Sequence, residues 1–171
     1  MAVRQIRKSG DELLSKKCKM VKEITPAIIS ALEDMAETLH SVDGVGLAAP
    51  QVGILKRIAV IEFDENFYEL INPEIIETEG EQTCKEACLS APGYYGDVNR
   101  PLKLTVKATN RLGEEYSVTV EDYMASVFSH ELDHLDGIMY TDKASNLQRI
   151  DQEQLEEYKK ARKIAALEKT K

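Results

Sequence analysis

The sequence predicts an α+β fold, in which antiparallel β-sheets pack around a central helix and further helices lie near both ends of the chain. Apolar residues recur at helical spacing in three segments, whereas several short β-type runs follow one another with no helix between them. The chain has 171 residues and no repeat or low-complexity linker. We therefore expect a single domain with one buried core.

The first half of the chain predicts one helix followed by short strands. Thr25 and Pro26 form a typical helix start, and apolar residues then recur at helical spacing as far as residue 39, so a helix is expected over 25–41. A loop at 43–46 ends it. Strands are expected at Arg57–Phe63, Phe67–Ile71, Pro73–Glu79, Leu102–Thr109 and Tyr116–Val120, with a hairpin turn over Asn110–Gly113 between the last two.

Two helices are expected in the remainder. Residues 121–135 return to helical periodicity, with one apolar stripe and Gly137 as a stop signal. Residues 148–169 are rich in Glu, Leu, Lys and Ala, which are strong helix formers. We therefore expect residues 1–147 to form the body of the domain and residues 148–171 to add a C-terminal helix to it.

The composition favours a protein of the reducing cytoplasm. No stretch of 18 apolar residues occurs, and the N-terminus lacks the apolar segment of a signal peptide. Three cysteines are an odd number, which argues against a disulfide framework. We expect no membrane and no DNA partner. The net charge is −8, yet residues 158–171 hold six cations and one anion, so an acidic body ends in a basic tail.

The strongest chemical motif is the segment from His130 to His134, which reads His-Glu-Leu-Asp-His. Residues four apart on a helix lie one above the other, so both imidazoles reach one metal ion. Glu131 lies beside a ligand and reaches a metal-activated water without binding the ion. A metal lowers the pKa of water towards ~7, and a carboxylate takes and returns the proton. The motif therefore predicts a metal-dependent hydrolase.

The motif alone leaves the third ligand open. One large group of metalloproteases extends it with a third histidine, but Tyr140 stands at that position. A second group uses a downstream glutamate, for which Glu153, Glu156 and Glu157 are candidates. This alternative predicts a zinc aminopeptidase or endopeptidase. The third histidine, His40, is expected to be solvated at a helix end.

Cys84 and Cys88 are the other candidate ligands, because a thiolate suits Zn or Fe(II) together with two imidazoles. Both cysteines with both histidines would form a closed structural site, the non-enzymatic alternative. One cysteine leaves the fourth position open, as a catalytic site requires. In an extended segment the two cysteines are ~13 Å apart and cannot share an ion, which favours a single cysteine ligand.

Three segments together resemble the peptide deformylases, which remove the formyl group from the N-terminal methionine of new bacterial proteins. The family pattern Gly-x-Gly-x-Ala-Ala-x-Gln is complete at residues 44–51. The pattern Glu-Gly-Cys-Leu-Ser stands at 86–90, and His-Glu-x-x-His at 130–134. Looser similarity runs from about residue 4 to residue 144. Ala87 replaces the family's glycine, which would cost roughly 1 kcal/mol if the backbone there needed a positive φ.

The resemblance implies a set of roles for named residues. Cys88 becomes the third ligand with His130 and His134, and Fe(II) is the favoured divalent ion, often replaced by Zn, Ni or Co in preparations. The same resemblance assigns residues 1–147 as the deformylase catalytic domain. Glu131 is implied as general base and then acid when hydroxide attacks the formyl carbon of an N-formylmethionyl peptide. Gln51 and the backbone N–H of Leu89 are implied as donors to the oxyanion.

Substrate binding is expected near the same motifs. Gly44 and Gly46 lack Cβ atoms, so an extended peptide backbone can approach them closely. Ser126, Val127 and Val45 are the candidates for the wall of a methionine pocket. An ion pair between Glu86 and Arg100 is expected to orient the loop that carries Cys88.

The basic tail gains a partner from the resemblance, because in some deformylases a C-terminal helix docks near the ribosome exit. Cations of the tail are therefore expected to contact ribosomal RNA phosphates, with an affinity that falls as salt rises. The candidates are Lys159, Lys160, Arg162 and Lys163.

Overall fold

The computed structural model describes residues 2–169, except for the side chains of residues 152, 155, 162 and 165–169. Its helices are α1 (Pro26–Ser41), α2 (Asp122–Leu135) and α3 (Gln152–Lys169), with short 3-10 turns at Glu12–Ser15, Ala49–Val52 and Tyr140–Asp142. Its strands are β1 (Gly46–Ala48), β2 (Ile58–Phe63), β3 (Asn66–Glu79), β4 (Gln82–Cys88), β5 (Ala91–Arg100), β6 (Lys103–Thr109), β7 (Glu115–Glu121) and β8 (Ser145–Arg149). No helix among the described residues is long and apolar enough to cross a membrane.

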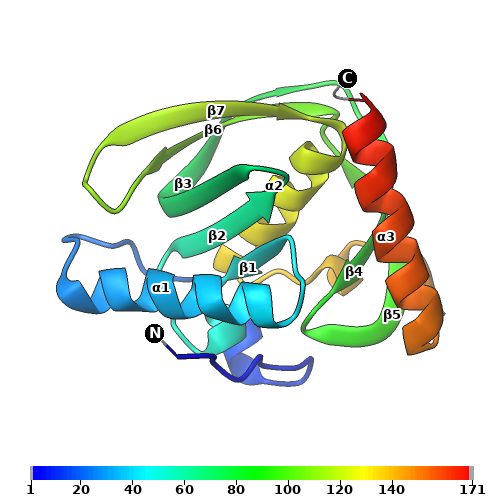
Figure 1. Cartoon of the computed structure of the whole chain (residues 1–171), viewed down its shortest axis with the longest axis horizontal. Coiled ribbons are helices and arrows are strands. Elements are labelled where there is room, and N and C mark those ends of the chain that lie inside the picture. Colours follow the sequence, from blue (N-terminus) through cyan, green and yellow to red (C-terminus); the bar gives the residue numbers. More distant parts are fainter. Residues whose placement is uncertain (1, 170–171) are drawn as a thin grey trace.

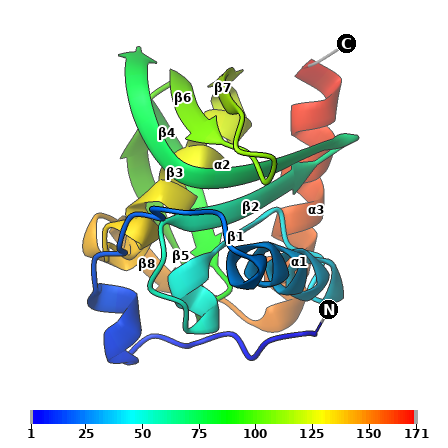
Figure 2. The same ribbon diagram turned by 90° about the vertical axis from the view of Figure 1, so that its left-hand side faces the viewer.

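A five-stranded antiparallel sheet, in the order β1-β2-β3-β6-β7, separates two helices. Alternate residues of β2 face opposite sides, so Ile58 and Val60 pack with α1 while Ala59 and Ile61 pack with α2. Figures 1 and 2 show α1 and α2 on the two sides of this sheet. The predicted α+β fold around a central helix is confirmed.

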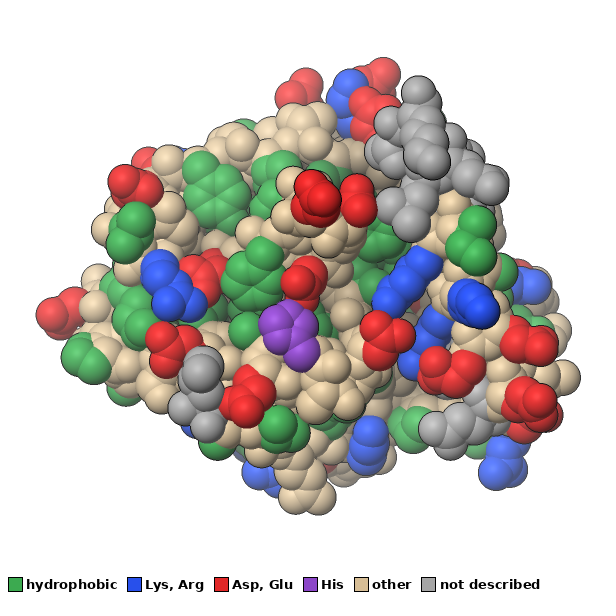
Figure 3. Space-filling model, in the orientation of Figure 1, with side chains coloured by type: hydrophobic (Ala, Val, Ile, Leu, Met, Phe, Trp, Pro, Cys, Tyr) green, Lys and Arg blue, Asp and Glu red, His purple; other side chains and the backbone are tan. Residues whose placement is uncertain are grey.

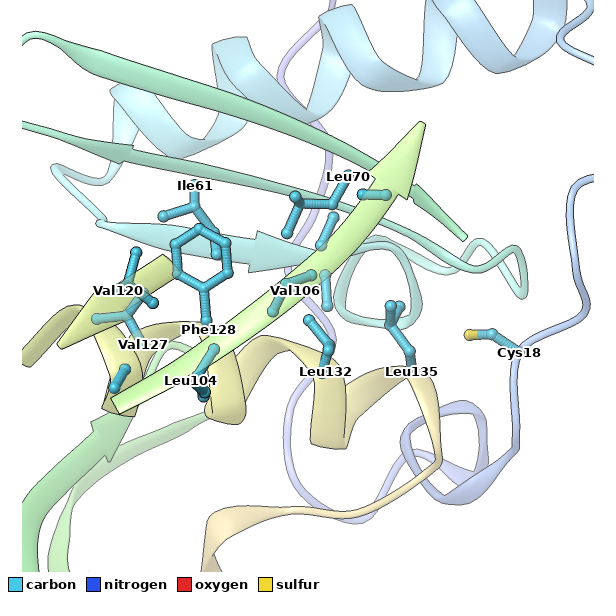
Figure 4. Packing of buried hydrophobic residues seen from close by; sticks show 14 residues of the cluster. Cys18, Ile61, Leu70, Leu104, Val106, Val120, Val127, Phe128, Leu132 and Leu135 are labelled. Carbon is cyan, nitrogen blue, oxygen red and sulfur yellow. The ribbon is translucent and has the colours of Figure 1, made fainter. Parts of the chain in front are cut away.

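The apolar stripe of α2 fixes this helix against the sheet. Figure 4 shows Phe128 and Leu132 reaching from the helix towards Ile61, Leu70 and Val106 of the strands. Phe128 is fully buried and meets the ring of Tyr68 edge-on, with centroids 5.4 Å apart. Burying a side chain of this size stabilises the fold by roughly 2–3 kcal/mol. The opposite face of α2 is thereby left to carry the polar motif.

A second, three-stranded antiparallel sheet has the order β4-β5-β8. The sequence did not predict these strands, because β5 contains Pro92, Gly93 and Gly96 and β8 is exposed along its length. Tyr140 packs beneath the sheet, and its hydroxyl donates to the Tyr94 carbonyl at 2.9 Å. This sheet brings the end of β4 to α2.

Two predicted boundaries were wrong. The two strands expected over 67–79 are one strand, β3, whose register shifts between Ile71 and Glu74. Asn72 adopts a φ of 52° at this bulge, and its amide group bonds both the N–H and the carbonyl of Val21 at 2.8 Å. Pro73 is tolerated there because a bulge needs no ladder N–H.

The C-terminal helix begins at Gln152 rather than at residue 148. Gln148 and Arg149 pair with Tyr95 and Tyr94 of β5, so edge pairing overrides their helix propensity. The Asp151 carboxylate then accepts from the Gln154 N–H at 2.8 Å, as a helix cap does. Figure 1 shows α3 standing beside β4 and β5 at one side of the molecule.

Candidate metal centre

Helix α2 presents the two histidines of the motif to one point in space. His130 and His134 are four residues apart, and their Nε2 atoms lie 3.2 Å from each other. The rings meet edge-on, with centroids 4.8 Å apart and planes at 81°. Both side chains are buried in a helix that the apolar core holds in place.

Cys88 completes a cluster of three ligand atoms. It is the last residue of β4, and its Sγ lies 3.3 Å from Nε2 of His134. The ligand atoms of Cys88, His130 and His134 all lie within 4.8 Å of one another. The cluster thus combines two segments that are far apart in sequence, the end of β4 and the helix α2.

The chemistry of this donor set fits a divalent metal ion. Burial alone would raise the pKa of the Cys88 thiol, but His134 and His130 beside the sulfur outweigh it and hold the pKa well below its ordinary value. The Ser90 N–H and Gln51 Nε2 donate to the same sulfur at 3.4 and 3.6 Å. A thiolate is the form that binds metal, and one thiolate with two imidazoles suits Zn, Fe(II), Ni or Co.

A buried ion-pair network holds the first histidine. Glu86 accepts from Nδ1 of His130 at 2.8 Å. It also forms a bidentate ion pair with Arg100, whose Nε and Nη2 donate to the two carboxylate oxygens at 2.7 and 2.9 Å. Arg100 also donates to Asp133 at 2.6 Å. The Arg100 and His130 bonds hold the pKa of Glu86 well below its ordinary value despite burial. Because Nδ1 of His130 is bonded to Glu86, Nε2 is the ring nitrogen that faces the cluster. The predicted ion pair between Glu86 and Arg100 is confirmed.

Glu131 is an unpaired buried carboxylate. The residue is 4% exposed, and Oε2 finds no hydrogen-bond partner among the described residues. Burial raises its pKa to about 7. A Cβ atom added to Gly46 would lie 2.5 Å from Glu131 Oε1, so Gly46 leaves the space that this carboxylate occupies. A carboxylate whose pKa lies near neutrality is suited to take and return a proton.

Gln51 is oriented by its own backbone neighbours. Its Oε1 accepts from the Ala48 N–H at 2.8 Å, so its Nε2 is directed towards Cys88 and Ser90. Leu89 follows Cys88 directly and lines the cavity that opens onto the cluster. Its carbonyl accepts from Lys8 Nζ at 2.7 Å. Both residues predicted to supply donors therefore line the cavity that contains Cys88 and His130.

One cavity of about 590 Å³ opens onto this cluster. All five residues expected to bind substrate line it, together with the predicted catalytic residues and two of the three ligands: Gly44, Val45, Gly46, Ser126, Val127, Gln51, Leu89, Glu131, Cys88 and His130. Ser126 differs from the expectation in one respect, because its hydroxyl donates to Glu86 at 2.9 Å and so also supports the ion-pair network.

Several candidates lie elsewhere. Cys84 is buried on β4 but does not belong to the ligand cluster, and His40 pairs with Glu62 at the surface. No glutamate of α3 joins the cluster formed by the described residues. Ala87 lies inside β4 without a positive φ, so replacing the family's glycine does not strain the backbone there.

Sequence reasoning missed part of the cavity wall. Lys8, Tyr123 and four residues of α3, namely Glu156, Tyr158, Lys159 and Lys163, also line it. The basic tail was the available signal, but nothing in the sequence placed that tail against residues 43–46. The ring of Tyr140, which stacks on His130 with centroids 5.9 Å apart, was also missed as a support of the site.

The comparisons with known proteins agree with this site. The family model described as polypeptide deformylase matches residues 3–150. The chain belongs to the polypeptide deformylase family. A peptide deformylase from Acetivibrio thermocellus is 51% identical over 91% of each chain. Another, from Carboxydothermus hydrogenoformans, is 50% identical over 87% of this chain and 98% of its own length.

Solved structures of peptide deformylases share the fold. The crystal structure of the Thermotoga maritima enzyme matches with a TM-score of 0.82 at 38% identity, covering 85% of this chain and 99% of that one. The Legionella pneumophila structure gives the same TM-score at 34% identity and covers 99% of this chain and 97% of its own. A Synechococcus elongatus deformylase, solved in complex with actinonin, matches with a TM-score of 0.79 at 37% identity, over 82% and 78% of the two chains.

Proposed function

We propose that this deformylase hydrolyses the N-formyl group from the N-terminal formylmethionine of nascent polypeptides and releases formate. The observation that carries the proposal is the unpaired carboxylate of Glu131, buried beside the ligand cluster of Cys88, His130 and His134. A buried charge without a partner is costly, so its retention is best explained by a proton that it must accept.

Cys88, His130 and His134 would hold one divalent ion, with Fe(II) favoured and Zn, Ni or Co accepted. When bound, the ion lowers the pKa of a water towards ~7 and polarises the substrate carbonyl. Glu131 takes the proton of the attacking water at its carboxylate oxygen and later delivers it to the leaving amine nitrogen. Gln51 Nε2 and the Leu89 N–H donate to the carbonyl oxygen as negative charge develops on it.

The remaining residues orient the substrate. The methionine side chain enters the pocket between Val45, Val127 and Ser126, where apolar contact selects for its length. The peptide backbone pairs with the edge at Gly44–Gly46, which recognises an extended chain without reading its sequence. Gly46 serves both purposes, since it also leaves room for Glu131.

Formate release from formyl-Met-Ala tests the proposal, with the metal content measured on protein prepared without oxygen. We expect one formate for each free Met-Ala, and inhibition by actinonin, the compound in the Synechococcus structure. Acetyl-Met-Ala serves as the matched control, because its extra methyl group must fit where the formyl hydrogen lies. Cleavage between Met and Ala without formate would instead support the peptidase alternative.

The substrate class suggests the compartment of the enzyme and its macromolecular partner. Formylated chains arise at the ribosome, so we place the enzyme in the cytoplasm, with residues 1–147 as its catalytic domain. Lys160 is exposed on α3 and is available to ribosomal RNA phosphates, whereas the side chain of Arg162 lies outside the described residues. Loss of ribosome binding in Lys160→Glu, with activity on short peptides intact, would support this contact.

A further inference from the structure

Helix α3 forms a wall of the active-site cavity, although it lies beyond the family match, which ends at residue 150. Tyr158, Lys159 and Lys163 line the cavity from one side. The segment Gly44–Gly46, which we propose to pair with the substrate backbone, lines the same cavity. A peptide lying along that segment therefore passes close to α3, because Lys163 pairs with Asp43, the residue before Gly44.

Two sets of contacts hold α3 against the rest of the protein. The ring of Tyr158 stacks on Tyr95 with centroids 6.2 Å apart, and its hydroxyl donates to the carbonyl of Lys85. Lys163 pairs with Asp43 at 3.1 Å, directly before Gly44. The helix thus joins β4 and β5 on one side and the loop ahead of β1 on the other.

Helix α3 contributes two cations, Lys159 and Lys163, and one anion, Glu156, to the cavity wall, in a protein whose net charge is −8. The side chains of Lys159 and Lys163 are only about one third exposed, at 32% and 33%. Their partners Glu156 and Asp43 are 57% and 87% exposed, so each pair lies at the rim and is weak in water. Figure 3 shows Lys and Arg side chains gathered over the middle of α3.

We propose that Lys159 and Lys163 are specificity-determining residues that bind a carboxylate side chain of the substrate, two to four residues along the nascent chain. The proposal rests on the proposed deformylase function. A substrate carboxylate would displace the rim partners Glu156 and Asp43 and would exclude water from ammonium groups that are already partly desolvated. Chains with Asp or Glu after the formylmethionine are therefore deformylated faster than chains with Lys or Arg.

The test compares amidated peptides formyl-Met-Ala-Ala-Ala in which position 2, 3 or 4 is replaced in turn by Glu, Gln or Lys. At low salt, kcat/KM should favour Glu over Lys by roughly three- to tenfold at one position at least. Gln should fall between them. Raising the salt to 0.5 M should remove most of the preference, because screening weakens partly exposed pairs.

The double variant Lys159→Gln, Lys163→Gln should bring the Glu to Lys ratio close to one. Lys160→Gln is the matched control, since Lys160 is exposed on the same helix and does not line the cavity, and it should keep the wild-type ratio. Thermal unfolding and metal content verify that all variants are folded and loaded. A wild-type ratio near one at every position, or a ratio unchanged in the double variant, would overturn the proposal. Failure of all peptides to release formate would instead contradict the deformylase function itself.

Discussion

The two sheets of this molecule differ in what they bury. The five-stranded sheet is packed on both faces by apolar side chains against α1 and α2. The three-stranded sheet β4-β5-β8 buries fewer apolar residues, yet it holds Glu86, Cys88 and Arg100 in the interior. We infer from this difference that the large sheet supplies most of the stability of the fold and the small sheet most of the support of the ligand cluster, and that the two regions meet along α2.

Helix α2 takes part in both regions because its faces differ. Phe128 and Leu132 pack into the core of the large sheet, whereas His130 and His134 face Cys88. If the two regions are separable, substitutions on the side of β4 should change metal binding or turnover at nearly constant stability. Substitutions in the large core should lower stability at nearly constant metal binding and turnover.

The largest expected effect on the site is that of Cys88→Ser. Removing the thiolate leaves two imidazoles, so we expect metal content to fall and kcat/KM for formyl-Met-Ala to drop by at least about 10³-fold. Cys84→Ser, on the same strand but outside the cluster, is the control and should retain metal and activity. Loss of folding in both variants would indicate a closed structural site, and retained activity in both would point to the peptidase alternative.

Glu131→Gln should keep the metal and lower kcat by about 10²- to 10⁴-fold, because the proton acceptor is lost. It should also stabilise the metal-free protein at pH 8. The folded-state pKa of Glu131, about 7, lies above its ordinary 4.5, so wild-type stability is lost as pH rises through that interval. The variant avoids this loss, which we expect to be about 3 kcal/mol.

Chemical denaturation in the presence of a chelator, at pH 4.5 and at pH 8, measures this effect. The two proteins should be equally stable at the lower pH and differ at the higher one. Equal stability at both values would contradict the buried, unpaired state of the carboxylate.

A smaller effect is expected for Arg100→Lys. The substitution keeps the positive charge beside Glu86 but loses the two-pronged geometry that fixes it. His130 is then oriented less firmly, and we expect metal affinity to fall by roughly tenfold. Competition with a chelating dye measures the affinity, and Arg111→Lys, at a pair with Glu69 far from the cluster, is the control. Equal affinities in both variants would remove Arg100 from the support of the site.

The smallest effect on the site itself should follow from Leu70→Ala on β3. Leu70 is fully buried in the core of the large sheet, so its truncation should cost about 2–5 kcal/mol of unfolding free energy. Below the new melting temperature, metal affinity and kcat/KM should stay within about twofold of wild type. A marked loss of metal would show that the two regions are energetically coupled.

The residue pattern alone could predict the large sheet apart from β1, and the two histidine ligands, but not the sheet that carries Cys88. Strands such as β2 are continuous apolar runs, and α2 combines an apolar stripe with a ligand motif, so local periodicity suffices. The strand β5 contains Pro92, Gly93 and Gly96 and is typical of a loop; only its pairing with β4 makes it extended. The start of α3 was misplaced for the same reason, since β8 depends on an edge partner.

The site was predicted in its parts but not in its surroundings. The ligand Cys88 was selected by resemblance, because spacing in the chain left both cysteines and three glutamates open. The wall formed by α3 could not be foreseen, since the contact between Lys163 and Asp43 spans 120 residues. Helical propensity says where a helix forms and not what it covers.

The separation in sequence between Cys88 and His134, 46 residues, has a consequence for the lifetime of the folded protein. In the unfolded chain, bringing these groups together requires closing a long loop, so an ion binds the folded form far better. A bound ion would link Cys88 on β4 to the two histidines of α2, so its bonds would have to break before β4 separates from α2. Metal loading should therefore lengthen the survival of the enzyme at high temperature by slowing its unfolding rate.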